Sequence, residues 1–267
     1  MSISINNSYI NPMNRDLRIL LFTVDDFFYV RNYLFAFIQL FGDRIVGFYE
    51  CKERNPFLTI QEFLFICGTS HFAYRSTLYI WRRFLSSIGK GDYSVINHLR
   101  RMGVKRIKSK NMALEAFVEE IRELQPDLLL SVGNNEIIPK QVLKIPLLGA
   151  YNAHCSILPE FRGILTAFWI LLKEAKEVGV TIHRIGSGID DGPIALQHRE
   201  SIGTRKTMDS IYDDMTKMGG KLLVELVSRL EQYGVELKEN EDRKATTFGK
   251  PTKKEIREFR IKGYRFC

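Results

Sequence analysis

Short apolar segments alternate with longer segments of helical periodicity along most of this chain. Apolar side chains fill residues 17–23 and 44–49, and the aromatic segment 27–41 between them is long enough for a crossover helix. Residues 127–132 read Asp-Leu-Leu-Leu-Ser-Val, which is typical of a strand buried on both faces. The alternation predicts a doubly wound α/β domain with a mostly parallel sheet.

The second half of the chain continues this pattern. Asn111 is the expected N-cap of a helix whose apolar side chains run from Leu114 to Leu124, because its side chain can accept a hydrogen bond from the first turn. Gly219-Gly220 indicates a kink or a point of close packing in a long helix. Strands are expected at 104–108, 147–152, 178–185 and 193–198, and helices at about 165–177 and 208–233.

The pattern also indicates how the chain is divided. We expect a catalytic α/β domain over 15–234, interrupted by an aromatic and basic insertion at 51–95, and a short basic C-terminal extension over 235–267. Within the insertion, residues 72–88 resemble an amphipathic helix with Arg75, Arg82 and Arg83 on its edge. Such a helix packs on its domain more often than it binds a partner or a membrane surface.

Composition and charge narrow the class of protein. The 267 residues are 45% hydrophobic and 26% charged, as in ordinary globular proteins. The net charge is +8, with six basic residues and no acid at 100–110 and nine basic against four acidic residues at 241–267. These segments suggest an anionic partner such as a nucleotide, RNA or an acidic membrane face, and a solvated surface is an equally good interpretation.

The cysteines and the N-terminus indicate a cytoplasmic protein. Four cysteines at wide spacing contain no CxxC pair, which favours reduced thiols over disulfides or a zinc site. No apolar run approaches the roughly 18 residues of a membrane span. The polar segment 1–14 lacks the pattern of a secretory signal.

Polar side chains end two of the expected elements. Asn152 and His154 are two apart at the end of a strand, so they point to the same side. Asp190 lies in the glycine-rich loop 186–192. An amide, an imidazole and a carboxylate suit the addition of a nucleophile to a carbonyl. Cys155 is expected to face the opposite side of the strand. His183 is interpreted as a packed or surface histidine. The histidines show no spacing typical of metal ligands.

The residues around this strand end resemble a known signature. The segment reads Asn152-Ala153-His154-Cys155-Ser156-Ile157-Leu158-Pro159-Glu160-Phe161-Arg162-Gly163. It is similar to the Asn-x-His-x-Ser-Leu-Leu-Pro-x-Tyr/Phe-Arg/Lys-Gly motif of the folate-dependent formyltransferases, which include methionyl-tRNA, glycinamide-ribonucleotide and amino-sugar N-formyltransferases. Residues 179–183, Trp169 and 189–194 also match in the correct order, whereas Ile157 and Thr166 depart from the usual Leu and Pro.

This resemblance implies a Rossmann-like formyltransferase fold, 10-formyltetrahydrofolate as co-substrate, no metal, and transfer of a formyl group to a primary amine. Asn152, His154 and Asp190 match the catalytic trio of the family. The pterin is expected between segment 133–139 and loop 188–190, although Ile137 and Ile138 can equally be core residues. The expected cofactor-binding residues are Asn134, Ile137, Ile138, Pro139, Gly188 and Ile189.

The acceptor is expected to be a nucleotide-linked amino sugar, used in surface-polysaccharide synthesis. Within the family a Gly-rich first turn binds the phosphate of glycinamide ribonucleotide, but here that turn carries Asp25 and Asp26. The tRNA enzymes carry a β-barrel domain, for which the 33 residues after 234 are too few. An aminoacyl-tRNA or another amine is the alternative acceptor; a formyl-folate hydrolase and a non-catalytic folate-binding module stay open. The long helix and the extension could form a homodimer contact.

Overall fold

A six-stranded sheet forms the centre of the molecule. The computed structural model describes residues 9–51, 64, 68–91, 93–134 and 136–266. Neighbouring strands β3, β2, β4 and β5 run parallel, whereas β7 and β8 follow as antiparallel strands at one edge. The predicted fold class is confirmed. The strands are β2 (Ile19–Thr23), β3 (Ile45–Glu50), β4 (Leu128–Val132), β5 (Ala150–His154), β7 (Glu177–Arg184) and β8 (Ile194–Ser201).

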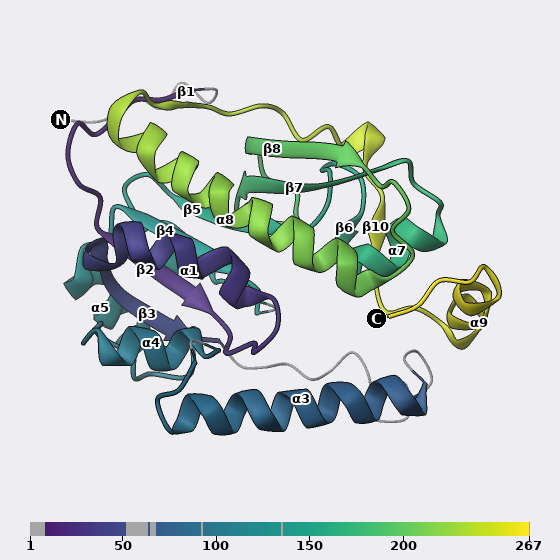
Figure 1. Cartoon of the computed structure of the whole chain (residues 1–267). Coiled ribbons are helices and arrows are strands. Elements are labelled where there is room, and N and C mark those ends of the chain that lie inside the picture. Colours follow the sequence, from purple (N-terminus) through teal and green to yellow (C-terminus); the bar gives the residue numbers. More distant parts are fainter. Residues whose placement is uncertain (1–8, 52–63, 65–67, 92, 135, 267) are drawn as a thin grey trace.

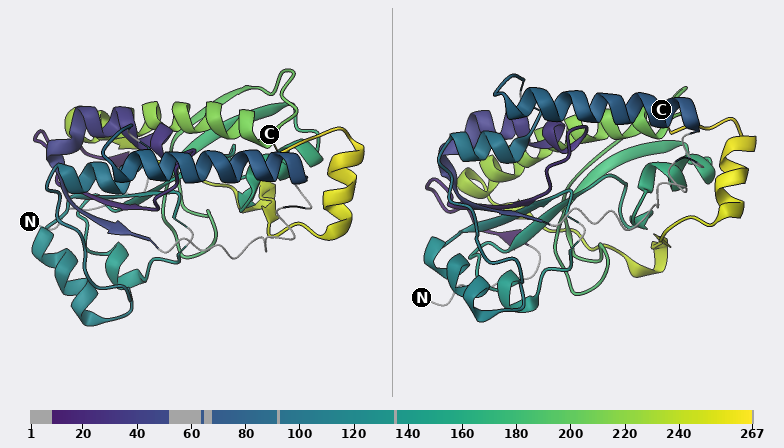
Figure 2. Two further views of the ribbon diagram at one scale, coloured as in Figure 1. Left: turned by 60° about the horizontal axis from the view of Figure 1, so that its bottom comes forward. Right: turned by 90° about the horizontal axis from the view of Figure 1, so that it is seen from below.

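Helices cover both faces of the sheet, so the molecule has three layers (Figures 1 and 2). Helices α1 (Val30–Phe41) and α8 (Met208–Gln232) lie side by side on one face, and α5 (Glu115–Leu124) and α6 (Lys140–Leu143) lie on the other. All five residues of β4 are buried, as expected of a central parallel strand. None of the described helices is long and apolar enough to cross a membrane.

Helices α1 and α8 touch at the two glycines of α8. A Cβ atom on Gly219 would lie 2.0 Å from the Tyr33 ring, and one on Gly220 would lie 2.8 Å from the carbonyl oxygens of Asn32 and Tyr33. Because α8 runs unbroken from Met208 to Gln232, the glycines serve close packing and not a kink.

Replacing Gly220 by alanine is therefore expected to lower the free energy of unfolding. The methyl group meets backbone atoms that cannot rotate away, and overpacking of this kind costs about 1–3 kcal/mol. The better helix propensity of alanine, worth about 1 kcal/mol, offsets part of that cost. Urea denaturation measures the difference, with the exposed neighbour Lys221→Ala as control. Equal stability of the two variants would contradict the packing role.

Three local expectations from the sequence are wrong. Residues 104–108 are not a strand, because only Arg106 pairs with Phe48, as an isolated bridge. Asn111 does not cap α5: its side chain accepts a hydrogen bond from the Ala113 amide (3.0 Å), and the helix begins after Leu114. The helix expected over 165–177 is α7 (Thr166–Leu172), which ends early because the chain turns at Glu174 with a φ of 53°.

The segment 51–95, which we expect to be an insertion, contains a helix close to the expected one. Helix α3 (Thr69–Ser87) lies along the α1 and α8 side of the molecule, followed by α4 (Val95–Arg101) (Figure 2). Arg75 is buried, whereas Tyr74, Trp81 and Phe84 are more than half exposed. The helix therefore packs through its arginine edge. Residues 52–63 and 65–67 of the insertion lie outside the described residues.

Residues 235–266 fold back onto the domain. Strand β9 (Val235–Glu236) pairs with β1 (Tyr9–Ile10), and β10 (Thr247–Phe248) pairs with β6 (Arg162–Gly163). Helix α9 (Lys253–Ile261) packs on α7, where the rings of Phe259 and Phe168 stack with centroids 4.6 Å apart. This segment therefore reaches the edge of the sheet where β5 ends.

Candidate active site

Strands β5 and β7 bring polar side chains together at this edge. Asn152 on β5 pairs directly with His183 on β7, and the Asn152 side-chain nitrogen lies 3.3 Å from Nε2 of His183. His183 Nδ1 donates a hydrogen bond to the Arg184 carbonyl (3.0 Å), so Nε2 is the ring nitrogen that faces Asn152. His154 follows at the end of β5 and is buried.

Asp190 contacts both histidines from the loop between β7 and β8. One carboxylate oxygen lies 3.4 Å from His183 Nε2, and the other lies 3.5 Å from His154 Nδ1. The second oxygen also accepts a hydrogen bond from the Gly163 amide (2.8 Å). Asp190 has a φ of 47°, a conformation that Asp adopts more readily than most residues. The structure thus brings Asn152, His154 and Asp190 together and adds His183.

His183 is the residue that sequence reasoning left out of the site. It is buried, as a packed histidine would be, but its ring also contacts Asp190 and Asn152. Its pairing opposite Asn152 depends on the antiparallel return of β7. The sequence signal that could have indicated His183 is its position at the end of segment 179–183, which matches a motif in the sequence analysis.

Burial and charge set the protonation states of this cluster. Burial opposes ionisation of Asp190, but the two imidazoles and the Gly163 amide outweigh it and hold its pKa well below the ordinary value. Burial lowers the pKa of His154 below 6.5, and the charge of Asp190 offsets part of that effect. His154 Nε2 donates to the Phe161 carbonyl (3.0 Å), so Nδ1 faces Asp190 and can take up a proton.

The lowered pKa of His154 predicts a pH-dependent stability. The unfolded chain binds a proton at His154 near pH 6.5, whereas the folded chain binds it only at lower pH. The free energy of unfolding therefore falls as the pH drops through about 6.5, by up to about 1.4 kcal/mol per pH unit. His154→Gln is expected to flatten this slope in urea titrations at several pH values. Asp190 affects the free energy of unfolding in a different pH range. The lowered pKa of its carboxyl stabilises the fold at neutral pH, and this contribution is lost only as the pH falls below about 3.8. Coincident slopes for the two proteins would show that His154 is not buried in its neutral form.

The C-terminal segment supports the Asp190 loop. The Asn240 side chain donates to the carbonyl oxygens of Asp190 (2.8 Å) and Gly192 (3.0 Å). Arg162 in turn donates to both the side chain and the carbonyl of Asn240. Asp191 points back into its own loop and accepts from the Gly188 amide (2.8 Å). Asp190 is therefore held from two sides while its carboxylate faces the histidines.

The six expected cofactor residues lie in contrasting environments. Ile137 and Ile189 are 89% and 63% exposed, so their side chains are accessible to a ligand. Ile138 is buried in the core, which fits the packing alternative. The Asn134 side chain is bonded to the backbone of Glu136, whereas Pro139 precedes α6 and Gly188 is exposed.

Other candidate chemistry is absent from the described part of the chain. Cys155 faces away from the site, since its sulfur lies 2.9 Å from the Tyr33 hydroxyl, and burial raises its pKa to about 11. No cluster of three metal-ligating side chains occurs among the described residues. In the first turn, Asp26 accepts hydrogen bonds from the Phe28 and Tyr29 amides and so occupies the N-terminal end of α1.

Comparison with known proteins places this geometry in context. Several curated methionyl-tRNA formyltransferases match part of the chain, and two of them serve as examples. That of Kosmotoga olearia is 32% identical over 156 residues, covering 58% of this chain and 50% of the relative. That of Citrifermentans bemidjiense is 33% identical over 153 residues, covering 57% and 48%. The chain thus spans about half the length of the curated relatives it matches.

Solved structures share the fold at low sequence identity. An N-formyltransferase from Helicobacter canadensis, in complex with folinic acid and dTDP-3-aminofucose, has a TM-score of 0.59 at 16% identity, covering 91% of this chain and 79% of that one. Phosphoribosylglycinamide formyltransferase from Bacillus halodurans has a TM-score of 0.57 at 17% identity, covering 81% and 96%. Residues 94–227, half of the chain, match the family model described as formyl transferase. The resemblance seen in the motifs is thereby confirmed, and the chain belongs to the formyl transferase family.

Proposed function

We propose that this protein transfers a formyl group from 10-formyltetrahydrofolate to the primary amine of a nucleotide-linked amino sugar. One observation carries the proposal: Asn152, His154 and Asp190, which the motifs assign to catalysis, meet at the carboxyl end of β5. Family membership supports formyl transfer as the class of reaction.

The cluster suits the bond changes of this reaction. A bond forms between the acceptor nitrogen and the formyl carbon, the bond from that carbon to the donor nitrogen breaks, and one proton passes from the acceptor nitrogen to the donor nitrogen. The Asn152 amide can donate a hydrogen bond to the carbonyl oxygen as it becomes negative. His154 Nδ1 can take up and return the proton, because the adjacent Asp190 carboxylate stabilises the charged imidazole.

Two exposed apolar residues on the expected cofactor segments fit a folate. Ile137 follows β4, Ile189 immediately precedes Asp190, and both side chains are left in solvent by the fold. A flat ring placed on them covers apolar surface, and backbone groups of the same segments are available to its polar edge. When bound, the folate supplies the activated formyl group. Asn134, Pro139 and Gly188 are proposed to line the same site.

A nucleotide-linked amino sugar is the acceptor that we favour. The Helicobacter canadensis neighbour is solved with such a sugar, and its likeness extends over most of this chain. The alternative is an aminoacyl-tRNA, favoured by the methionyl-tRNA formyltransferases among the relatives. Part of the basic segment 100–110 is already neutralised, since Arg100 and Arg106 both pair with Glu50. This pairing reduces the charge available to RNA at that surface.

A mass-spectrometric assay tests the proposal. The protein is incubated with 10-formyltetrahydrofolate and a library of nucleotide-linked amino sugars, with methionyl-tRNA in a parallel reaction. We expect one formyl unit on one member of the library. Formylation of the tRNA alone would replace the acceptor, and release of formate without an acceptor would indicate a hydrolase. Folate binding without either reaction would indicate a binding module and contradict catalysis.

A further inference from the structure

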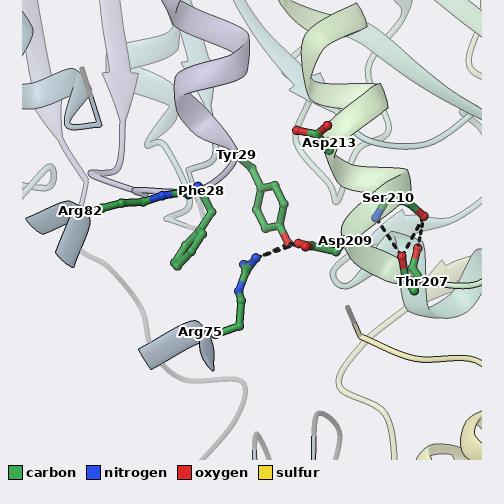
Figure 3. Close-up of a pocket in the computed structure, with 8 residues that line it drawn as sticks. All are labelled: Phe28, Tyr29, Arg75, Arg82, Thr207, Asp209, Ser210 and Asp213. Atoms are coloured by element: carbon green, nitrogen blue, oxygen red, sulfur yellow. Dashed lines mark hydrogen bonds and ion pairs between the residues drawn. The ribbon is translucent and has the colours of Figure 1, made fainter. Parts of the chain in front are cut away.

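A cavity of about 330 Å³ lies among helix α3, the start of α1 and the start of α8 (Figure 3). Phe28, Tyr29, Arg75 and Arg82 form much of its wall. None of the catalytic trio lines it. Tyr29 precedes Tyr33 by one helical turn, and the Tyr33 hydroxyl contacts Cys155 on the face of β5 opposite to the trio.

One of the two arginines in this wall is neutralised. Arg75 forms an ion pair with Asp209 (2.9 Å), which also accepts a hydrogen bond from the Tyr29 hydroxyl. Figure 3 shows these three side chains pointing toward one another. The Arg75 guanidinium also lies 3.7 Å above the centre of the Phe28 ring. Arg75 and Asp209 thus join α3 to α8, and their charges cancel.

Arg82 and its neighbour Arg31 leave a surplus of positive charge. Arg82 donates to the Phe27 carbonyl (2.9 Å), and both guanidiniums lie over the Tyr93 ring, at 5.4 and 5.1 Å from its centroid. Within the described residues, neither arginine forms an ion pair with a carboxylate. Burial and then repulsion from Arg31 lower the pKa of Arg82, as expected where cations gather without an anion.

The backbone amides at the starts of α1 and α8, which could also bind an anion in this cavity, already have hydrogen-bond partners. The amides that begin α1 bond to Asp26. At the start of α8, the Met208 and Asp209 amides bond to the carbonyl oxygens of Arg265 and Phe266. The remaining carboxylate in the wall, Asp213, is paired with Lys217 (2.5 Å) and Asn32 (3.0 Å) and adds little net negative charge.

We propose that this cavity binds the diphosphate of a nucleotide-linked acceptor. Arg82 is its direct partner, and the positive charge of the neighbouring Arg31 strengthens the attraction. The inference rests on the proposed function, since it names the part of the acceptor that is held away from the reacting amine. Arginine recognises phosphate oxygens through two parallel N–H donors. The volume is that of a small-molecule site. An RNA surface would meet the exposed Arg83 instead of the half-buried Arg82.

Adjacent arginines on α3 allow a matched test. Isothermal titration of the full chain with dTDP, UDP and inorganic pyrophosphate measures binding without any formyl transfer. Arg82→Gln is expected to weaken nucleoside diphosphate binding by about tenfold or more, because a charge-assisted hydrogen bond is lost. Arg83→Gln, at the exposed neighbour, is expected to stay within about twofold of the parent. Arg31→Gln lowers the same charge surplus without breaking the Phe27 contact, so it tests the site even if Arg82→Gln folds poorly.

One control separates this inference from the proposed function. Binding of 5-formyltetrahydrofolate is expected to be unchanged in Arg82→Gln, because Arg82 lies outside the proposed folate site. If the parent formylates no amine but Arg82→Gln still weakens dTDP binding, the cavity assignment stands and the proposed function fails. Equal losses in Arg82→Gln and Arg83→Gln would overturn the assignment. Nucleotide binding insensitive to both Arg31 and Arg82, or a parent that binds only tRNA, would overturn it as well.

Discussion

Replacing Asp190 by asparagine is expected to lower kcat for formyl transfer by about three orders of magnitude, while folate affinity changes little. Asparagine keeps the shape, and its oxygen can still accept from the Gly163 amide (2.8 Å in the parent). The negative charge beside His154 and His183 is lost, however, so a protonated imidazole is no longer stabilised. In a hydrolase where a carboxylate supports the catalytic histidine, the amide form of that carboxylate loses about 10⁴ in kcat, and a somewhat smaller loss is expected for the longer contacts here.

Single-turnover kinetics with a saturating formyl donor measures this loss, and titration with a folate analogue measures binding. Asp191→Asn is the matched control, because Asp191 lies next in the chain but points into its own loop toward the Gly188 amide. Asparagine can retain that acceptor, so activity is expected to fall only a few-fold. Activity of Asp190→Asn within threefold of the parent would exclude Asp190 from the catalytic group.

Replacing Asn152 by alanine is expected to reduce kcat by about 100- to 1,000-fold with little change in KM for the donor. The amide is the uncharged donor of the cluster, and loss of one such donor to a developing negative oxygen typically costs about 3–4 kcal/mol of barrier. The loss falls on kcat because the hydrogen bond strengthens only as charge develops.

Asn152→Asp provides the second measurement. It preserves size but replaces the donor by a carboxylate, so its activity is expected to fall at least as far as that of Asn152→Ala. Because the Asn152 side chain also lies 3.3 Å from His183, both variants are compared with His183→Gln. Near-parental kcat in Asn152→Asp would show that no hydrogen bond is donated from this position.

The fold could be predicted wherever one segment determines its own structure. Strand β4 and helix α8 agree with the expected segments to within about a residue at each end, because a continuous apolar run and a 25-residue stripe leave few alternatives. Elements that depend on distant partners were predicted poorly. The segment 104–108 has strand composition, but it forms only an isolated bridge to β3, between Arg106 and Phe48. Leu114 fits the helical stripe of α5, yet it precedes the helix and is 52% exposed.

The same distinction between local and distant contacts decides which site residues could be predicted. Asn152 and His154 could be assigned because a two-residue spacing on one strand places both side chains on one side. His183 could not, since its contact with Asp190 depends on β7 returning antiparallel beside β5. The role proposed for Arg82 was equally hidden: the sequence shows Arg82 and Arg83 as neighbours, and only the packing of α3 distinguishes the half-buried Arg82 from the exposed Arg83.

The bonds from Asn240 to the Asp190 loop bear on how the protein is made. Asp190 is translated 50 residues before the side chain that holds its carbonyl. A growing polypeptide that has emerged from the ribosome only as far as α8 already contains every proposed catalytic group, yet its Asp190 loop still lacks that brace. Such a nascent chain is expected to gain full activity only after residue 240 has been released.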